Sequence, residues 1–493
     1  MSEQQPNREK FASRLGFILV SAGCAIGIGN VWKFPYLCGQ YGGAAFILIY
    51  LVFLVIMGIP VMIFEFAVGR ASQHSAALAF DTLEPEGTHW HIMKIFCMVG
   101  NYLLMMYYTT VCGWMFDYFV RQCSGEFVGA TPKQVQTGFN EMLGNTGELA
   151  LCTIVVCLIG FLICFFGVQN GVERITKWMM AALFILMIIL TIHSVFLEGA
   201  GAGIRFYLVP DFKKMAEIGI GNVVYQAMGQ SFFTLSIGMG SMLIFGSYLD
   251  KERSLTGEAT TVTSLDTAVA LMAGFIIIPA CFAFGIQPDA GPSLIFITIP
   301  NLFAKMPGGQ FWGALFFVFL SFAALSTVIA VFENIIAFDM DLFKWSRKKS
   351  VLICAPILIA LSLPCVLGFN VWSGFQPLGK GSTILDLEDF IVSNNVLPLG
   401  SFVFVLFCTR KNGWGWDNFL KEADTGKGVK FPRSIRWYVT WVLPVIILVI
   451  FFKGYYDKFA PMGRGPLVGW MIFAVALVGF LLYCASSKPR KSK

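Results

Sequence analysis

The chain has 493 residues, of which 57% are hydrophobic and only 13% are charged, and its mean hydropathy is +0.72. So few charges cannot cover a soluble protein of this length, so the composition excludes a soluble protein and indicates a membrane protein with many spans. The net charge of +6 does not indicate a nucleic-acid partner, because Lys and Arg in membrane proteins mainly reflect topology.

Twelve apolar segments are long enough to cross a bilayer, which takes about 20 residues. In chain order they cover 14–38, 43–69, 92–121, 149–168, 173–197, 220–248, 257–287, 309–343, 350–369, 384–409, 435–455 and 465–486. We expect no cleavable signal peptide, because the chain opens with the polar stretch MSEQQPNREK. With the N-terminus inside, the inner segments carry 24 Lys and Arg and the outer loops 10, which predicts that both termini are cytoplasmic.

The first and sixth spans each contain a glycine-rich stretch. AIGIGN at 25–30 and SIGMGS at 236–241 share the pattern small residue, Ile, Gly, hydrophobic residue, Gly, polar residue. Glycine costs roughly 1 kcal/mol inside a helix, so both stretches predict a helix that unwinds halfway through the membrane. Close packing through glycine is the alternative, but the matched pair, with Asn30 and Thr234 at the breaks, favours unwinding.

Unwound backbone at that depth is tolerated only where it faces a cavity and binds a ligand. Half-helix N-termini suit a carboxylate, and freed carbonyl oxygens suit a cation. Matched breaks in two halves of a chain are typical of a transporter built from inverted repeats.

Five segments then carry a family resemblance: RLGFILVSAGCAIGIGNVWKFPYLCGQYGGAAF, GIPVMIFEFAVGR, MMYYTTVCGW, GQSFFTLSIGMGS and FAALSTVIAVFENIIAFDMD. With them the chain resembles the neurotransmitter:sodium symporter family, and in particular its shorter prokaryotic members such as the bacterial leucine transporter. The resemblance implies an all-α polytopic membrane protein of about 12 helices, with an inverted repeat of 5+5 helices, broken helices 1 and 6, and two further C-terminal helices. The implied parts are a cytoplasmic tail (1–13), the first repeat (14–200), the second repeat (201–410), a cytoplasmic loop (411–434), helices 11 and 12 (435–487) and a cytoplasmic tail (488–493).

The implied function is sodium-coupled import of a neutral hydrophobic or aromatic L-amino acid across the plasma membrane by alternating access. The implied cofactor is Na⁺, with two ions and no organic cofactor. The implied partners are the amino acid substrate and the lipid bilayer, without nucleic acid, and the protein is expected to be a monomer or a weak homodimer.

The resemblance also assigns site residues by position. The substrate carboxylate would meet the N–H groups of Ile28 and Gly29 and the Tyr108 hydroxyl; the ammonium would meet the carbonyls of Ala25, Phe233 and Thr234 and the Ser236 hydroxyl. The pocket for the side chain would comprise Leu104, Tyr108, Phe233, Met239, Thr327, Val328 and Val331. One sodium would bind at Ala25, Asn30, Thr234, Asp266 and the substrate carboxylate; the second would bind at Gly23, Ile26, Ala323, Ser326 and Thr327. The outer gate would be Lys33 with Asp389, and the inner gate Arg8 with Asp341, near Ser247 and Tyr248.

Several positions depart from the family pattern. Asp266 replaces a more usual Asn and supplies a negative charge beside the sodium ions, while Ala270 offers no anion ligand, so we expect chloride independence. Lys33 replaces a gate Arg and makes a point-charge contact with Asp389, so we expect a looser or water-bridged gate. Ala181 replaces a Pro that helps to unwind the fifth helix, so the inner sodium path is expected to open by another route.

The pocket contains no charged side chain, which disfavours acidic and basic substrates. Met239 replaces an aromatic wall, and because Met repacks around varied shapes, it favours bulky apolar substrates, although Leu104 takes some of the space back. An ordinary apolar helix stripe is the alternative interpretation of these positions.

Other function classes receive less support. A proton-coupled permease of the same architecture would carry a titratable group at the second sodium site, where Ser326 and Thr327 stand. A channel or receptor is disfavoured because no repeated filter sequence and no Arg ladder is present. No His lies in a Cys, Asp or Glu cluster suited to a catalytic metal, and HWH at 89–91 is expected to be a loop that anchors the chain at the membrane interface.

Overall fold

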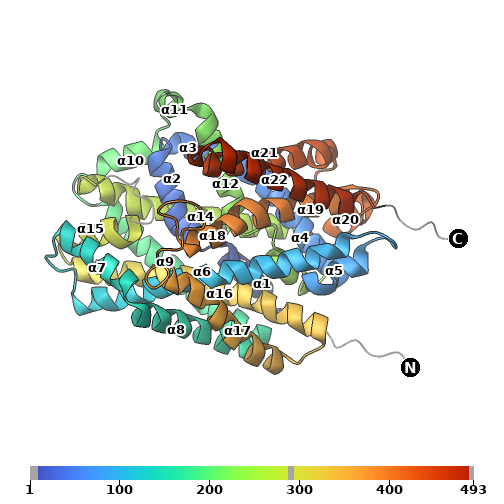
Figure 1. The fold of residues 1–493 in the computed structure, drawn as a ribbon, viewed down its shortest axis with the longest axis horizontal. Coiled ribbons are helices and arrows are strands. Elements are labelled where there is room, and N and C mark those ends of the chain that lie inside the picture. Colours follow the sequence, from blue (N-terminus) through green and yellow to red (C-terminus); the bar gives the residue numbers. More distant parts are fainter. Residues whose placement is uncertain (1–8, 287–293, 488–493) are drawn as a thin grey trace.

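The computed structural model describes residues 9–286 and 294–487. In these residues every named element is helical, and the extended pairing is limited to one isolated bridge between Arg253 and Lys427. The helices form one elongated bundle, and the chain enters and leaves it at the same end, here called the terminal end (Figure 1). The expectation of an all-α protein is confirmed.

Ten helical segments of the described chain are long and apolar enough to cross a membrane. They consist of α3 (Ala44–Phe53) with α4 (Ile59–Ser72), α6 (Met93–Ser124), α8 (Thr146–Phe165), α9 (Arg174–Val195), α14 (Leu255–Ala283), α16 (Gly309–Phe343), α17 (Arg347–Leu367), α18 (Ile384–Ile391) with α19 (Leu397–Thr409), α21 (Leu443–Phe459) and α22 (Arg464–Ala485). An eleventh span is α1 (Arg14–Ala25) joined to α2 (Phe34–Gln40), with a bend of 57°. The remaining expected span is divided into α12 (Ile220–Thr234) and α13 (Ser241–Ser247).

Short helices occupy several of the connections. They are α5 (Ala76–Leu83), α7 (Pro132–Gly144), α10 (Ala200–Leu208), α11 (Phe212–Ile218), α15 (Ile299–Lys305) and α20 (Trp416–Ala423). The start of α7 has a clear local cause, because Thr131 and Gln134 form a capping box. The Thr131 side chain accepts a hydrogen bond from the Gln134 N–H, and the Gln134 side chain accepts one from the Thr131 N–H.

Five π-helical turns in the described chain each end two residues before a proline. They are η1 (Gly29–Lys33) before Pro35, η2 (Leu54–Gly58) before Pro60, η5 (Leu294–Thr298) before Pro300, η6 (Val392–Val396) before Pro398 and η8 (Tyr438–Val442) before Pro444. Proline lacks an N–H and its ring crowds the preceding turn, so the helix widens there. Proline does not dictate this outcome, because Pro279, Pro356 and Pro364 lie inside unbroken α-helices.

The remaining irregular turns of the described chain are one further π-helical turn and three 3₁₀ turns. η4 (Val168–Glu173) begins after Gly167, whose φ of 86° is accessible mainly to glycine. Three 3₁₀ turns are η3 (Trp90–Ile92), η7 (Arg433–Ile435) and η9 (Ala460–Met462).

Helix α16 forms the centre of the bundle and α22 its edge. In their most apolar stretches, 83% of α16 but only 22% of α22 is buried within the protein. Around α16 pack α6, α9 and α1, while α13 packs on α4. The first interrupted span is therefore held against the long helix α16, and the second part of the sixth, α13, against α4.

Candidate functional site

The first break separates α1 from α2. Helix α1 ends at Ala25, and the next regular turn begins only at Gly29. Two freed N–H groups find side-chain partners: Gly27 donates to Asn30 Oδ1 at 3.1 Å, and Ile28 donates to the Tyr108 hydroxyl at 3.0 Å. A Cβ added to Gly27 would lie 2.8 Å from Thr327 Oγ1, so glycine is needed here for close approach.

The second break covers Leu235–Gly240, between α12 and α13. Ser236 has a φ of +50°, in the left-handed region that non-glycine residues rarely adopt, and Gly238 has a φ of +101°. The unwound segments predicted in the first and sixth spans are thus present at the predicted residues.

Glu65 supports the second break and was missed from the sequence. It lies on α4, is fully buried, and its Oε1 accepts a hydrogen bond from the Gly238 N–H. A lone acid inside the apolar run GIPVMIFEFAVGR is the signal that could have identified it, because ionisable residues inside membrane helices are usually functional.

Oxygen atoms converge between α1 and α16, at the residues predicted for the second sodium. The Ser326 hydroxyl lies 3.0 Å from the Gly23 carbonyl oxygen, 3.5 Å from that of Ile26 and 2.9 Å from that of Ala323. The Thr327 hydroxyl lies 3.2 Å from the Gly23 oxygen and 3.3 Å from that of Ile26. The structure therefore brings all five predicted residues together.

The chemistry of this oxygen cluster fits a hard cation. A hydroxyl has one proton, and Ser326 can donate it to the carbonyl of Ala323 in its own helix. The Thr327 hydroxyl also has one proton, which can be donated to only one of the Gly23 and Ile26 carbonyl oxygens at a time. The other oxygen contacts are then between lone pairs. Oxygen ligands are those that hard cations prefer, and a cation among them would relieve this repulsion.

A second cluster joins the two breaks to α14, at the residues predicted for the first sodium. Asn30 Nδ2 lies 2.7 Å from Asp266 Oδ1 and 2.9 Å from Thr234 Oγ1, and Thr234 Oγ1 donates to Asp266 Oδ2 at 2.9 Å. Ala25, the remaining predicted protein ligand, is the last residue of α1.

Asp266 is fully buried, and no Lys, Arg or His within the described residues forms an ion pair with it. A buried carboxylate without a cationic partner costs several kcal/mol. The donor set therefore also fits a cation here.

A small cavity of about 20 Å³ lies between the two breaks. Its walls are Ala25, Gly27, Ile28, Gly29, Leu104, Tyr108, Phe233, Ser236, Met239, Thr327, Val392 and Leu397. Most predicted substrate residues are among them. Val392 and Leu397, from the tenth span, were not predicted.

Three predicted residues do not line this cavity. Thr234 belongs instead to the cluster around Asp266. Val328 turns toward α8, where a Cβ added to Gly160 would lie 3.1 Å from the Val328 Cγ1 atom. Val331, one helical turn beyond Thr327, is buried in the helix packing. Neighbouring positions of one helix point in different directions, and the apolar stripe of α16 did not reveal which residues face the cavity.

A larger cavity of about 340 Å³ lies beyond Phe233, near the end of α21 and thus away from the terminal end. The predicted outer gate lines it, but Lys33 and Asp389 form no direct ion pair in the described chain. Lys33 Nζ instead lies 3.9 Å from the ring centroid of Phe233. Asp389 accepts hydrogen bonds from Tyr107 and Ser393.

At the terminal end, Arg8 of the predicted inner gate lies outside the described residues. Asp341 Oδ2 accepts from the Ser75 N–H at 2.6 Å, and the Ser247 hydroxyl donates to the Ile244 carbonyl. Tyr248 donates to Glu333 Oε1 at 2.7 Å.

In the sequence, Arg347 at the terminal end is only one of the Lys and Arg residues that predict the orientation of the spans. Its guanidinium contacts the buried Glu333 at 2.6 and 2.9 Å, and Glu9 at 2.9 Å. Arg347 therefore links the N-terminal segment to α16.

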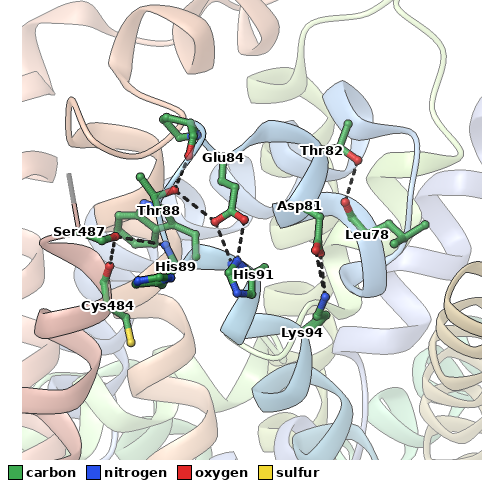
Figure 2. Close-up of polar contacts among 12 residues, drawn as sticks. Leu78, Asp81, Thr82, Glu84, Thr88, His89, His91, Lys94, Cys484 and Ser487 are labelled. Carbon is green, nitrogen blue, oxygen red and sulfur yellow. Dashed lines mark hydrogen bonds and ion pairs between the residues drawn. The ribbon is translucent and has the colours of Figure 1, made fainter. Parts of the chain in front are cut away.

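The HWH segment, which was expected to anchor the chain at the membrane interface, leads into the 3₁₀ turn η3, which begins at Trp90. Trp90 is 3% exposed and donates to the Asn412 carbonyl, so it packs inside the protein. Figure 2 shows His91 beside Glu84, with Nδ1 and Oε1 2.7 Å apart, and His89 beside Ser487. Within the described residues, no group of three or more His, Cys, Asp or Glu side chains could hold a metal.

Comparison with known proteins gives the family. The chain matches the model of the sodium:neurotransmitter symporter family over residues 8–134 and 125–485. A sodium-dependent transporter of Haemophilus influenzae is 34% identical over 465 residues, which cover 92% of this chain and 99% of that protein. The sodium-dependent serotonin transporter of Drosophila melanogaster is 26% identical over 523 residues, covering 95% of this chain and 79% of that protein.

A solved structure is similar over nearly the whole fold. The crystal structure of MhsT in complex with L-phenylalanine matches with a TM-score of 0.80 and 35% identity, covering 91% of this chain and 100% of that one. The chain therefore belongs to the sodium:neurotransmitter symporter family, whose members are sodium-dependent membrane transporters and not enzymes.

Proposed function

We propose that the protein couples the import of a neutral hydrophobic or aromatic L-amino acid to sodium, by alternating access across the plasma membrane. The observation that carries the proposal is the pair of oxygen clusters beside the two helix breaks, with a largely apolar cavity between them. The similarity to MhsT, whose structure contains L-phenylalanine, supports the substrate class.

The substrate's charged ends would bind backbone atoms of the breaks. Its carboxylate would bind the N–H groups of Ile28 and Gly29 and the Tyr108 hydroxyl, which already lies 3.0 Å from the Ile28 nitrogen. Its ammonium would bind the carbonyl oxygens of the breaks and the Ser236 hydroxyl. Leu104, Phe233 and Met239 would contact the side chain, and no charged residue lines that cavity, so a charged side chain would be left unpaired.

Two sodium ions would bind beside the substrate. The ion near Asp266 would share the substrate carboxylate as a ligand, so each would raise the affinity of the other by the same factor. The ion between α1 and α16 would link the first break to the central helix. Sodium binding would thereby favour the conformation that holds the amino acid.

Chloride would not be required. The buried Asp266 would supply a fixed negative charge beside the proposed sodium, where an anion would otherwise balance the cations. We expect sodium-driven uptake to continue at an unchanged rate when gluconate replaces chloride. A large fall in that rate would contradict the role proposed for Asp266 without affecting sodium coupling itself.

Uptake into proteoliposomes tests the proposed coupling. An inward sodium gradient should drive accumulation of labelled L-phenylalanine, and collapsing any pH gradient with a protonophore should leave that accumulation in place. If a pH gradient alone drives uptake and sodium does not, the protein is a proton-coupled permease and the proposal is wrong.

A further inference from the structure

Asn101 connects helices α6 and α16 to the second helix break by hydrogen bonds. It lies on α6, three residues before the cavity residue Leu104, and is 3% exposed. Its Nδ2 donates to the Met239 carbonyl at 2.9 Å and to the Cys97 carbonyl at 2.7 Å. Its Oδ1 accepts from Asn334 Nδ2 at 2.8 Å, and Asn334 on α16 is equally buried.

The orientation of the Asn101 amide follows from its neighbours. The carbonyl oxygens of Cys97 and Met239 can only accept hydrogen bonds, so the NH₂ group must face them. The Oδ1 atom then faces the NH₂ group of Asn334. Both amide atoms of Asn101 are satisfied, so the side chain is held in one position.

The Met239 carbonyl depends on this contact. Met239 lies in the unwound segment between α12 and α13, so its carbonyl has no regular helical partner. A carbonyl without a partner at this depth is costly, and Asn101 supplies the missing donor. Glu65 accepts the Gly238 N–H one residue earlier, so α4 and α6 hold the break through opposite backbone groups.

Met239 forms part of the cavity wall. We propose that the Asn101–Asn334 amide pair is the positioning element that fixes this wall and thereby sets the size of side chain that the site accepts. The inference rests on the proposed function and adds residues outside the cavity that determine selectivity. Neither amide lines the cavity, so both act through Met239.

The test compares binding of two probes, L-tryptophan and L-valine, to the purified full-length protein in sodium. Asn101→Ala removes the donor to Met239, whereas Asn334→Ala removes only the support behind Asn101. The matched control is Ser321→Ala, which deletes a buried side chain–backbone hydrogen bond (2.7 Å) on the same helix as Asn334, away from the break.

We expect Asn101→Ala to raise the ratio of the affinity for L-tryptophan to the affinity for L-valine by about fivefold, which corresponds to the loss of one hydrogen bond. The ratio rises because a released Met239 can move away from the cavity. Asn334→Ala should produce a smaller shift in the same direction, and remains informative if Asn101→Ala does not fold. Ser321→Ala should leave the ratio within about twofold of the unmodified protein. The inference is overturned if the ratio is unchanged in both Asn variants or if it shifts in favour of L-valine. It is also overturned if Ser321→Ala shifts the ratio by the same amount as the Asn variants.

A double-mutant cycle identifies the route. Met239→Ala removes the wall side chain, so adding Asn101→Ala to it should change the ratio by less than about twofold. A full additional shift would mean that Asn101 does not act through Met239. If the unmodified protein binds neither probe in a sodium-dependent manner, the proposed function fails; if it binds both and only the variants fail to shift, the positioning role alone is wrong.

Discussion

Ser326 lies where three carbonyl oxygens approach a hydroxyl that can donate only one proton. Replacing it with Ala removes one oxygen ligand of the proposed second sodium and leaves the helix intact. We expect Ser326→Ala to raise the sodium concentration needed for half-maximal amino acid binding by about tenfold, the loss of one interaction with a charged group.

The control for this change is Ser321→Ala, on the same helix and also buried, but outside the oxygen cluster. Sodium titrations of amino acid binding would be compared for the two variants. Equal sodium dependence in both would count against a sodium ion at Ser326.

At the residue scale, the sequence predicted polar contacts better than apolar ones. Asn30, Thr234 and Asp266 are polar residues in apolar spans, and the structure brings them together as predicted. Val328 and Val331 are apolar residues in an apolar helix, so nothing in the sequence distinguished a cavity wall from the helix core.

At the scale of single elements, the first break depends on close contact between backbone and side chains. A Cβ on Gly27 would collide with the Tyr108 hydroxyl and lie 2.8 Å from Thr327 Oγ1. We therefore expect Gly27→Ala to reduce amino acid affinity by at least about tenfold, because Tyr108 must move away from the Ile28 N–H.

Gly221→Ala is the matched control for Gly27→Ala, because a Cβ there, on the other broken helix, would meet nothing within 4 Å. Binding of labelled L-phenylalanine in sodium would be measured for both variants. Unchanged affinity in Gly27→Ala would contradict the proposed substrate position.

The breaks and the approximate bounds of the spans were predictable, because glycine pairs and apolar length are local signals. The π-helical turns were not predicted, although each of the five lies just before a proline. The short connecting helices were also missed. Most of them have seven to nine residues, which is too few for a strong periodic pattern, but α7 has 13 and its buried residues Val135, Phe139 and Met142 follow the helical period. Ala181 lies inside the continuous helix α9, while the irregular turn of this span is η4, at its beginning.

For the whole molecule, the two ends of the bundle differ. The end away from the termini contains the cavity of about 340 Å³, whereas ion pairs and hydrogen bonds hold the N-terminal segment at the terminal end. Glu173, 1% exposed, accepts from the Ala12 N–H at 2.7 Å and from the Ser13 hydroxyl at 2.9 Å. The proposed alternating access would require these contacts to be released when the terminal end opens.

Glu173→Gln should therefore loosen the N-terminal segment. We expect amide hydrogen exchange in peptides covering residues 9–25 to become about fivefold faster, because an amide is a weaker acceptor than a carboxylate. Asp457→Asn, which weakens an exposed ion pair with Lys453 at the opposite end, is the control and should leave these peptides unchanged. Equal exchange in the Glu173 variant and the unmodified protein would show that Glu173 does not hold the segment.

The order of the spans, their breaks and the family could be predicted from the sequence, because these signals are local or shared with relatives. The contacts of Arg347 with Glu9 and of Glu173 with Ala12 could not, since they join segments more than 150 residues apart along the chain.

The most direct test of the account measures thermal stability of the purified protein with each of the twenty amino acids, in sodium and in potassium at equal ionic strength. We predict that one or more neutral hydrophobic or aromatic L-amino acids stabilise the protein in sodium and do not in potassium, because the substrate and the ions share a site. Stabilisation of the same size in both salts, or by none of the twenty in sodium, would contradict the proposal that the two broken helices bind sodium and amino acid together.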